Sequence, residues 1–249
     1  INTLGDTTAL TGKPAFVTAP FQQTEEHPIV LIRPDVTAYD WAEISKAITS
    51  LKYADAILTC KPSASIPVTA LNEEERYSRY FAAFNRFMEP LKAKKVKKLV
   101  LSRPTFCPIN EEFSPLETFI KACNAYPRMM IYLCHTPVSG TWLGSTPEIL
   151  LSGHAMNWKT VALAGTMPIE NEVEPTEWSP KNQEEQSIVA EYVRKIVKKH
   201  GRKMLEKGPY TARAGQLVHL KTDFLFQLKE TGFLGDLLKK LHPTPAVCG

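Results

Sequence analysis

The sequence predicts an α+β fold of layered, mainly antiparallel β-sheets flanked by helices. Short apolar runs bounded by Pro, Gly or Asp recur along the chain, and several follow one another with no helical pattern between them. This order favours antiparallel pairing over a doubly wound parallel sheet. The glycine pairs in Gly140–Gly144 and Gly232–Gly235 lack the spacing of phosphate-binding loops, so nucleotide chemistry has no support.

The apolar runs define the predicted strands. We place them at Ile29–Arg33, Ala56–Cys60, Leu99–Ser102, Met129–Cys134, Thr141–Gly144, Val161–Ala164 and Gln216–Lys221. A further buried strand is expected at Ile149–Leu151, directly after Glu148. Their lengths and breaks are those of half-buried strands in a compact domain.

Three helices are predicted, the first two from capping residues and the third from its apolar stripe. Asn72 with Glu75 forms a capping box, and the aromatic stripe that follows at helical spacing as far as Leu91 is predicted to be core. Ser114 with Glu117 opens a second helix, which should run to about Ala125. A third helix should fill Asn182–His200, with one apolar stripe facing the sheet.

Composition limits the classes of protein. At 249 residues and 43% hydrophobic, the chain suits one packed domain, and we expect a monomer. It has no uninterrupted apolar run of about 18 residues and no secretory pattern at its start, which predicts a cytoplasmic protein with no membrane partner. The five cysteines are scattered without metal-ligand spacing, so we expect free thiols.

The net charge of +4 includes two dense basic runs, Lys92–Lys98 and Arg194–Lys207. Nucleic acid binding is one interpretation of them. No aromatic residues are interleaved with these lysines as single-strand binding requires, so solvated helix ends are the preferred interpretation. A basic balance also suits a small polyanionic substrate.

Three charged residues are candidates for chemistry: Lys98, Glu148 and Glu185. Each is expected at the start of a strand or helix, where the backbone holds it firmly. Each also has a simpler interpretation: a solvated lysine, a capping or edge carboxylate, and a helix-start charge that the dipole favours. A desolvated Glu148 would have a raised pKa and could act as a general acid.

Other classes of catalytic site are not supported. His219 lies between apolar residues in a predicted strand, where a satisfied core histidine is the default, and the remaining histidines lack zinc-ligand spacing. The sequence has no nucleophile elbow and no cysteine in a recognisable nucleophile setting. The candidates therefore indicate acid–base work without a covalent intermediate.

Six short motifs, in the same order and with similar spacing, resemble the chorismate-binding enzymes. The six are Lys98–Arg103, Gly144–Glu148, Ala162–Thr166, Lys181–Gln186, Val218–Leu220 and His242–Gly249. The resemblance divides one predicted domain, 1–249, into a variable amino-terminal portion (1–97) and a motif-bearing portion (98–249). It implies a fold of layered, mostly antiparallel sheets and activity on chorismate with Mg²⁺.

The resemblance also implies residue roles. Lys98 would activate water that adds to C2 of chorismate, and Glu148 would protonate the departing C4 hydroxyl. A shared desolvated pocket would push both groups toward neutrality. Glu185 would bind Mg²⁺, which holds the ring carboxylate of the substrate.

The remaining implied roles are substrate contacts. Gly165 and Thr166 would donate to the substrate through backbone and hydroxyl. Ala246 and Val247 would line it, and His219 would lie near its carboxylate. Gln186 stands where many family members have histidine, which is a mild departure because that side chain is not itself a metal ligand.

Individual residues indicate the branch of the family. Lys98 favours the isochorismate- and salicylate-forming branches over the aminating ones, and Ala164 stands where a covalent lysine would be. The closing His242–Gly249 motif favours isochorismate, by Mg²⁺-dependent isomerisation of chorismate. Salicylate formation and a catalytically inactive chorismate-binding fragment stay open as alternatives, as does a menaquinone or siderophore destination.

Family members continue for roughly another hundred residues beyond the closing motif, a length that a domain of ordinary size allows. The resemblance assigns to that part a second metal-binding glutamate and the arginine and lysine that hold the substrate carboxylates. We therefore expect residues 98–249 to hold the base, the acid and one metal ligand.

Overall fold

A computed structural model describes the chain except for residues 8–9, 11–13, 51–71, 106, 111, 171, 173, 176, 231, 233 and 247–249. The predicted strand Ala56–Cys60 lies outside the described residues. The chain divides into two compact units, one made of Ile1–Thr69 with Cys134–Trp142 and the other of Ala70–Leu133 with Leu143–Gly249. The predicted division at residue 97 stays a prediction.

The first unit is built on a small antiparallel sheet. Strand β3 (Ile29–Ile32) is its centre, with β1 (Asn2–Leu4) on one side and β2 (Phe16–Thr18) on the other. Three successive residues of β3 are buried, which a central strand covered on both faces requires. Helix α1 (Trp41–Ser50) follows. The predicted strand Ile29–Arg33 is confirmed.

Strands β4 (Met130–Thr136) and β5 (Gly140–Thr146) form a two-stranded sheet. The connection closes on Thr136, whose Oγ1 accepts from the backbone N–H of Ser139 at 2.8 Å. Both predicted strands in this region are therefore confirmed, each slightly longer than its apolar run indicated.

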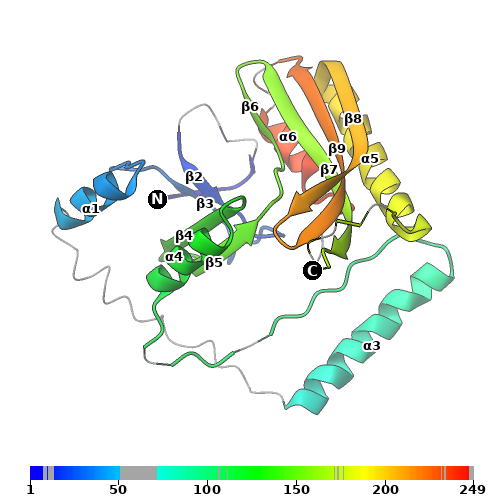
Figure 1. The fold of residues 1–249 in the computed structure, drawn as a ribbon, viewed down its shortest axis with the longest axis horizontal. Coiled ribbons are helices and arrows are strands. Elements are labelled where there is room, and N and C mark those ends of the chain that lie inside the picture. The colour runs from blue at the N-terminus through cyan, green and yellow to red at the C-terminus, as the bar shows by residue number, and fades with distance from the viewer. Residues whose placement is uncertain are drawn as a thin grey trace. The chain divides into compact units, whose positions relative to one another are not determined.

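The second unit contains a four-stranded antiparallel sheet in the order β6-β7-β9-β8 (Figure 1). The strands are β6 (Ser152–His154), β7 (Asn157–Pro168), β9 (Leu217–Leu228) and β8 (Gly201–Ala214). Helix α5 (Pro180–His200) packs along one face of this sheet, and α6 (Leu234–Leu241) packs against α5. The mainly antiparallel α+β fold is confirmed.

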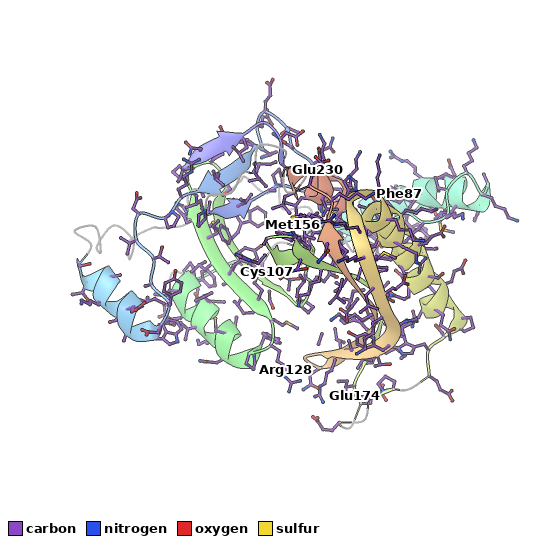
Figure 2. All side chains as sticks on the ribbon, turned by 90° about the horizontal axis from the view of Figure 1, so that it is seen from above. Phe87, Cys107, Arg128, Met156, Glu174 and Glu230 are labelled. Atoms are coloured by element: carbon purple, nitrogen blue, oxygen red, sulfur yellow. The ribbon has the colours of Figure 1, made fainter. Side chains whose placement is uncertain are left out.

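The core of this unit lies between α5, α6 and the sheet. Alternate residues of β9 from Val218 to Leu228 are buried, as a strand with one covered face requires. They meet the apolar stripe of α5, including Val189, Val193 and Val197, so the predicted stripe is confirmed. Figure 2 shows side chains filling the space between α5 and the sheet, with Met156 packed against this core.

Helix α3 (Glu73–Lys92) begins as predicted, since Asn72 and Glu75 make both hydrogen bonds of a capping box. The interpretation of its aromatic stripe as core is wrong. None of its described residues is buried, and Tyr77, Phe81 and Phe84 are 62%, 48% and 40% exposed. The ring of Phe81 instead contacts those of Tyr77 and Phe84 along the helix surface. Helical periodicity predicts a common face and does not show what covers it.

Helix α4 (Pro115–Ala125) begins after Ser114, whose hydroxyl accepts from the backbone N–H of Glu117. The predicted N-terminus and C-terminus of this helix are both confirmed. Helix α5 begins two residues before its predicted start, because Ser179 caps it and Pro180 occupies its first position.

Two strand predictions are wrong. Leu99–Ser102 and Ile149–Leu151 form no strand, and Leu99, Ile149 and Leu150 are each more than a third exposed. Neither segment pairs with a strand of the described sheets, and an apolar run without a partner strand does not become a strand. The second basic run was also misassigned, because residues 201–207 belong to edge strand β8 and not to a helix end.

Candidate functional site

A cavity of about 750 Å³ in the second unit gathers most of the predicted site residues. Six of them line it: Glu148, Gly165, Thr166, Glu185, His219 and Ala246. They come from the end of β5, the middle of β7, the first turns of α5, β9 and the closing motif. Val247 lies outside the described residues. Residues up to about a hundred positions apart in the sequence therefore line one cavity.

Lys98 reaches this site through its side chain. Its Nζ donates to Glu185 Oε1 at 2.7 Å and also to the carbonyl oxygen of Pro245. Three motifs therefore meet at one ammonium group, although Lys98 itself stands in an extended segment and not in a strand. The predicted base and the predicted metal ligand are a direct ion pair, a contact that the sequence did not indicate.

Glu148 follows β5 after Pro147, and its backbone N–H donates to Thr146 Oγ1 at 3.1 Å. Part of the residue is exposed, but neighbouring atoms crowd its carboxyl at the cavity wall. This burial raises the pKa of Glu148 above its ordinary range, and the nearby His219 opposes the rise. The expected direction of the pKa shift is confirmed, although the cavity and not a buried strand causes it.

His219 is held against a bulge in β7. Its Nδ1 lies 3.2 Å from the carbonyl oxygen of Gly165 and 3.1 Å from Thr166 Oγ1. Gly165 has a φ of +74°, a left-handed conformation that glycine adopts without strain. A Cβ at this position would stand 3.1 Å from Asn182 Cβ, so β7 and α5 approach closely here.

In the first turns of α5, the neighbouring residues Glu185 and Gln186 face the cavity and the core respectively. Glu185 lines the cavity, as does Asn182 one turn earlier, since residues three apart share a helix face. Gln186 instead points into the core, where its Nε2 donates to Ala162 O at 3.1 Å and to Thr222 Oγ1 at 3.0 Å. Its Oε1 is buried, with no hydrogen-bond partner among the described residues.

Several cavity residues were not predicted. Asn182 and Leu217 could have been found, because they stand one helical turn from Glu185 and two strand positions from His219. Tyr126 and Met129, which come from the turn after α4, carried no signal in the sequence. A second cavity of about 630 Å³ beside α5 is lined by Trp178, Arg194 and Glu206 among others, and includes none of the predicted site residues.

The oxygen donors of the main cavity fit a hard divalent cation in part. Glu185, Asn182 and Glu148 all line it, and Mg²⁺ uses one or two protein carboxylates while water and substrate oxygens complete its coordination. Across the described part of the chain, no group of three or more His, Cys, Asp or Glu side chains gathers closely enough to hold a metal. No described helix is long and apolar enough to cross a membrane.

The antiparallel α+β fold and this acid- and lysine-bearing cavity define a family. The chain belongs to the chorismate-binding enzymes, since the model of that family matches residues 18–249. The match extends well into the amino-terminal portion, 1–97, which holds none of the six motifs.

Two individual proteins are similar to large parts of this chain. The chain is 28% identical over 213 residues to chloroplastic isochorismate synthase 2 of Arabidopsis thaliana, covering 81% of this chain and 38% of that protein. It is 26% identical over 160 residues to the salicylate biosynthesis isochorismate synthase of Pseudomonas aeruginosa, covering 61% and 33%. The chain thus spans between a third and two fifths of the length of these relatives.

A solved structure shares the fold. It is assigned as a 2,3-dihydroxybenzoate-specific isochorismate synthase from Bacillus anthracis, and it superposes with a TM-score of 0.59 at 23% identity. The superposition covers 70% of this chain and 50% of that one.

Proposed function

We propose that this chain carries the isochorismate synthase reaction, in which water adds to C2 of chorismate and the C4 hydroxyl leaves. One observation carries the proposal: Lys98, Glu148 and Glu185, from distant segments, gather at one cavity with residues of every other motif. The two relatives named above, both isochorismate synthases, support the same reaction.

Glu148 is the general acid. Its raised pKa favours the protonated form, which the departing C4 hydroxyl needs, and its place at the cavity wall puts that proton within the proposed site. The hydroxyl leaves as water, both ring double bonds shift, and Glu148 is left as a carboxylate.

Lys98 is the general base. As the neutral amine it removes a proton from the water that attacks C2, and the ammonium then returns its proton through solvent to reset the pair with Glu148. In the structure its Nζ donates to Glu185 and Pro245. The neutral amine can keep both hydrogen bonds through its two N–H groups, and its lone pair then accepts the proton from water.

Glu185 is the proposed protein ligand for Mg²⁺, with Asn182 beside it. When bound, the cation supplies positive charge for the ring carboxylate of the substrate. Lys98 Nζ contacts Oε1 of Glu185 at 2.7 Å, so a cation held by Glu185 would share this carboxylate with the lysine.

Product analysis in isotopic water tests the proposal. The purified chain, chorismate and Mg²⁺ are incubated in H₂¹⁸O, and products are separated by chromatography and weighed by mass spectrometry. We expect isochorismate carrying one ¹⁸O atom, because the new C2 hydroxyl comes from solvent. Salicylate as the first product would indicate the salicylate-forming branch, isochorismate without ¹⁸O would exclude water addition, and bound but unconverted chorismate would indicate an inactive binding fragment.

A further inference from the structure

The pairing of β7 with β9 breaks at Gly165. The register passes from Ala164 opposite Leu220 to Thr166 opposite His219, so Gly165 has no partner on β9. Such a bulge releases one residue from the ladder and re-aims its backbone groups. Here the freed carbonyl oxygen of Gly165 lies 3.2 Å from His219 Nδ1.

This contact restricts where His219 carries its proton. A carbonyl oxygen only accepts hydrogen bonds, so a ring bonded to Gly165 must have its proton on Nδ1. A ring protonated on Nε2 alone would instead set the Nδ1 lone pair against the carbonyl oxygen. The hydroxyl of Thr166, 3.1 Å from the same nitrogen, can donate or accept and therefore adapts to either form.

We propose that the bulge at Gly165 fixes His219 in the tautomer with the proton on Nδ1, so that Nε2 offers a lone pair to the cavity. Gly165 is then a positioning residue that acts through His219, which itself lines the cavity. Its left-handed φ of +74° explains why this position is glycine.

The tautomer determines what His219 can bind. A neutral ring with a lone pair on Nε2 accepts a hydrogen bond from a hydroxyl or a water, and it repels a carboxylate. This part of the inference rests on the proposed function, and it revises the role that family resemblance implied, in which His219 lies near the substrate carboxylate. The tautomer itself depends only on the strand geometry.

Nitrogen NMR of the full chain tests the tautomer directly. The protein is labelled with ¹⁵N-histidine, and long-range ¹H–¹⁵N correlations are recorded at pH 8 without chorismate. The His219 signals are assigned by their loss in His219→Gln. We expect the ring protonated on Nδ1 alone. A ring protonated on Nε2 alone, or on both nitrogens at this pH, overturns the inference.

Two variants separate the carbonyl from the hydroxyl. Thr166→Val removes the hydroxyl and keeps a β-branched side chain of similar shape, so the Nδ1-protonated form should persist. A switch to the Nε2-protonated form in this variant would show that the hydroxyl controls the ring, and would overturn the role of Gly165. Gly165→Ala, if it folds, should mix the two tautomers, because the bulge cannot keep its conformation.

The two proposals fail separately. The NMR measurement contains no substrate, so an Nδ1-protonated ring in a chain that makes no isochorismate would remove the proposed function and leave this inference standing. An Nε2-protonated ring in a chain that makes isochorismate would overturn this inference and leave the proposed function standing.

Discussion

At the residue scale, the raised pKa of Glu148 suits its proposed role as a general acid but lowers the stability of the folded chain. Burial raises the pKa of its carboxyl in the folded chain above the value of an unfolded glutamate. The folded state therefore binds the proton more tightly, and it loses stability relative to the unfolded state as pH rises from the unfolded pKa through the folded one. At neutral pH the raised pKa of Glu148 is therefore a cost to folding.

Glu148→Gln is predicted to abolish turnover and to raise thermal stability at pH 7 to 8. The amide keeps the shape of the side chain but has no charge to desolvate. Below the pKa of an unfolded glutamate, about 4.3, wild type and variant should melt together because both side chains are neutral. Melting curves across this pH range check the prediction, and a variant less stable than wild type at pH 8 would refute it.

Glu185 and its neighbour Glu184 provide a matched pair for the metal site. Glu185 lines the cavity and pairs with Lys98, whereas Glu184 is exposed on α5. Glu185→Gln should weaken cation binding at least about tenfold, or ~1.4 kcal/mol, because it removes a carboxylate ligand. Glu184→Gln should leave it unchanged.

Mn²⁺ titration followed by electron paramagnetic resonance measures this affinity with the full chain and without substrate. Mn²⁺ shares the preference of Mg²⁺ for oxygen ligands. Equal affinities of the two variants for Mn²⁺ would show that Glu185 is not a ligand of the cation.

At the element scale, α3 and α4 were predictable because their signals are local. Asn72 and Ser114 each accept from a backbone N–H within their own first turn, and such caps are visible in a few residues of sequence. The cap of α5, Ser179, was missed, and α1 and α6 were not predicted. Whether a helix face is covered depends on distant segments, which is why the exposed aromatic face of α3 was predicted as core. Strands need partners, so Leu99–Ser102 could not be judged from its own apolar run.

Strand β8 was missed for a related physical reason. It is an edge strand, and its lysines and arginines are typical of edges that avoid further pairing. The predicted end of α5 at His200 is confirmed, but the basic run continues from this last turn into β8, so residues 201–207 were interpreted as a solvated helix end. Most of the candidate site was found through the family motifs. They did not indicate the pairing of Lys98 with Glu185 or the cavity residues outside the motifs, such as Tyr126 and Met129.

The alternation along β9 predicts different costs for two neighbouring residues. Phe224 is fully buried in the core between β9 and α5, whereas Leu225 on the opposite face is 44% exposed. Phe224→Ala should lower the free energy of unfolding by about 3–5 kcal/mol, mainly from lost burial and a cavity. Leu225→Ala should lower it by less than about 1 kcal/mol. Urea denaturation measures both, and similar losses would contradict the assigned faces of the sheet.

At the scale of the whole molecule, the candidate site lies within one compact unit. Every described residue that lines the main cavity, and Lys98 with its two acceptors, belongs to the unit made of Ala70–Leu133 and Leu143–Gly249. The site therefore does not depend on how the two units are arranged. The chain spans 38% of its Arabidopsis relative and 33% of its Pseudomonas relative, and activity is proposed for it on the strength of this cavity.

The most direct test of the account is the rate of isochorismate formation by the full chain and two lysine variants. Lys98 touches the predicted metal ligand at the cavity, whereas its neighbour Lys97 is exposed. A positioned base contributes about 10²–10⁴ in rate, so the rate of isochorismate formation should fall at least about a hundredfold in Lys98→Ala. The variant should keep its fold, because a partly exposed ion pair contributes only about 0–1 kcal/mol to stability. Lys97→Ala should keep the wild-type rate. A wild-type chain that forms no isochorismate, or a Lys98→Ala variant with a near-normal rate, would contradict the account.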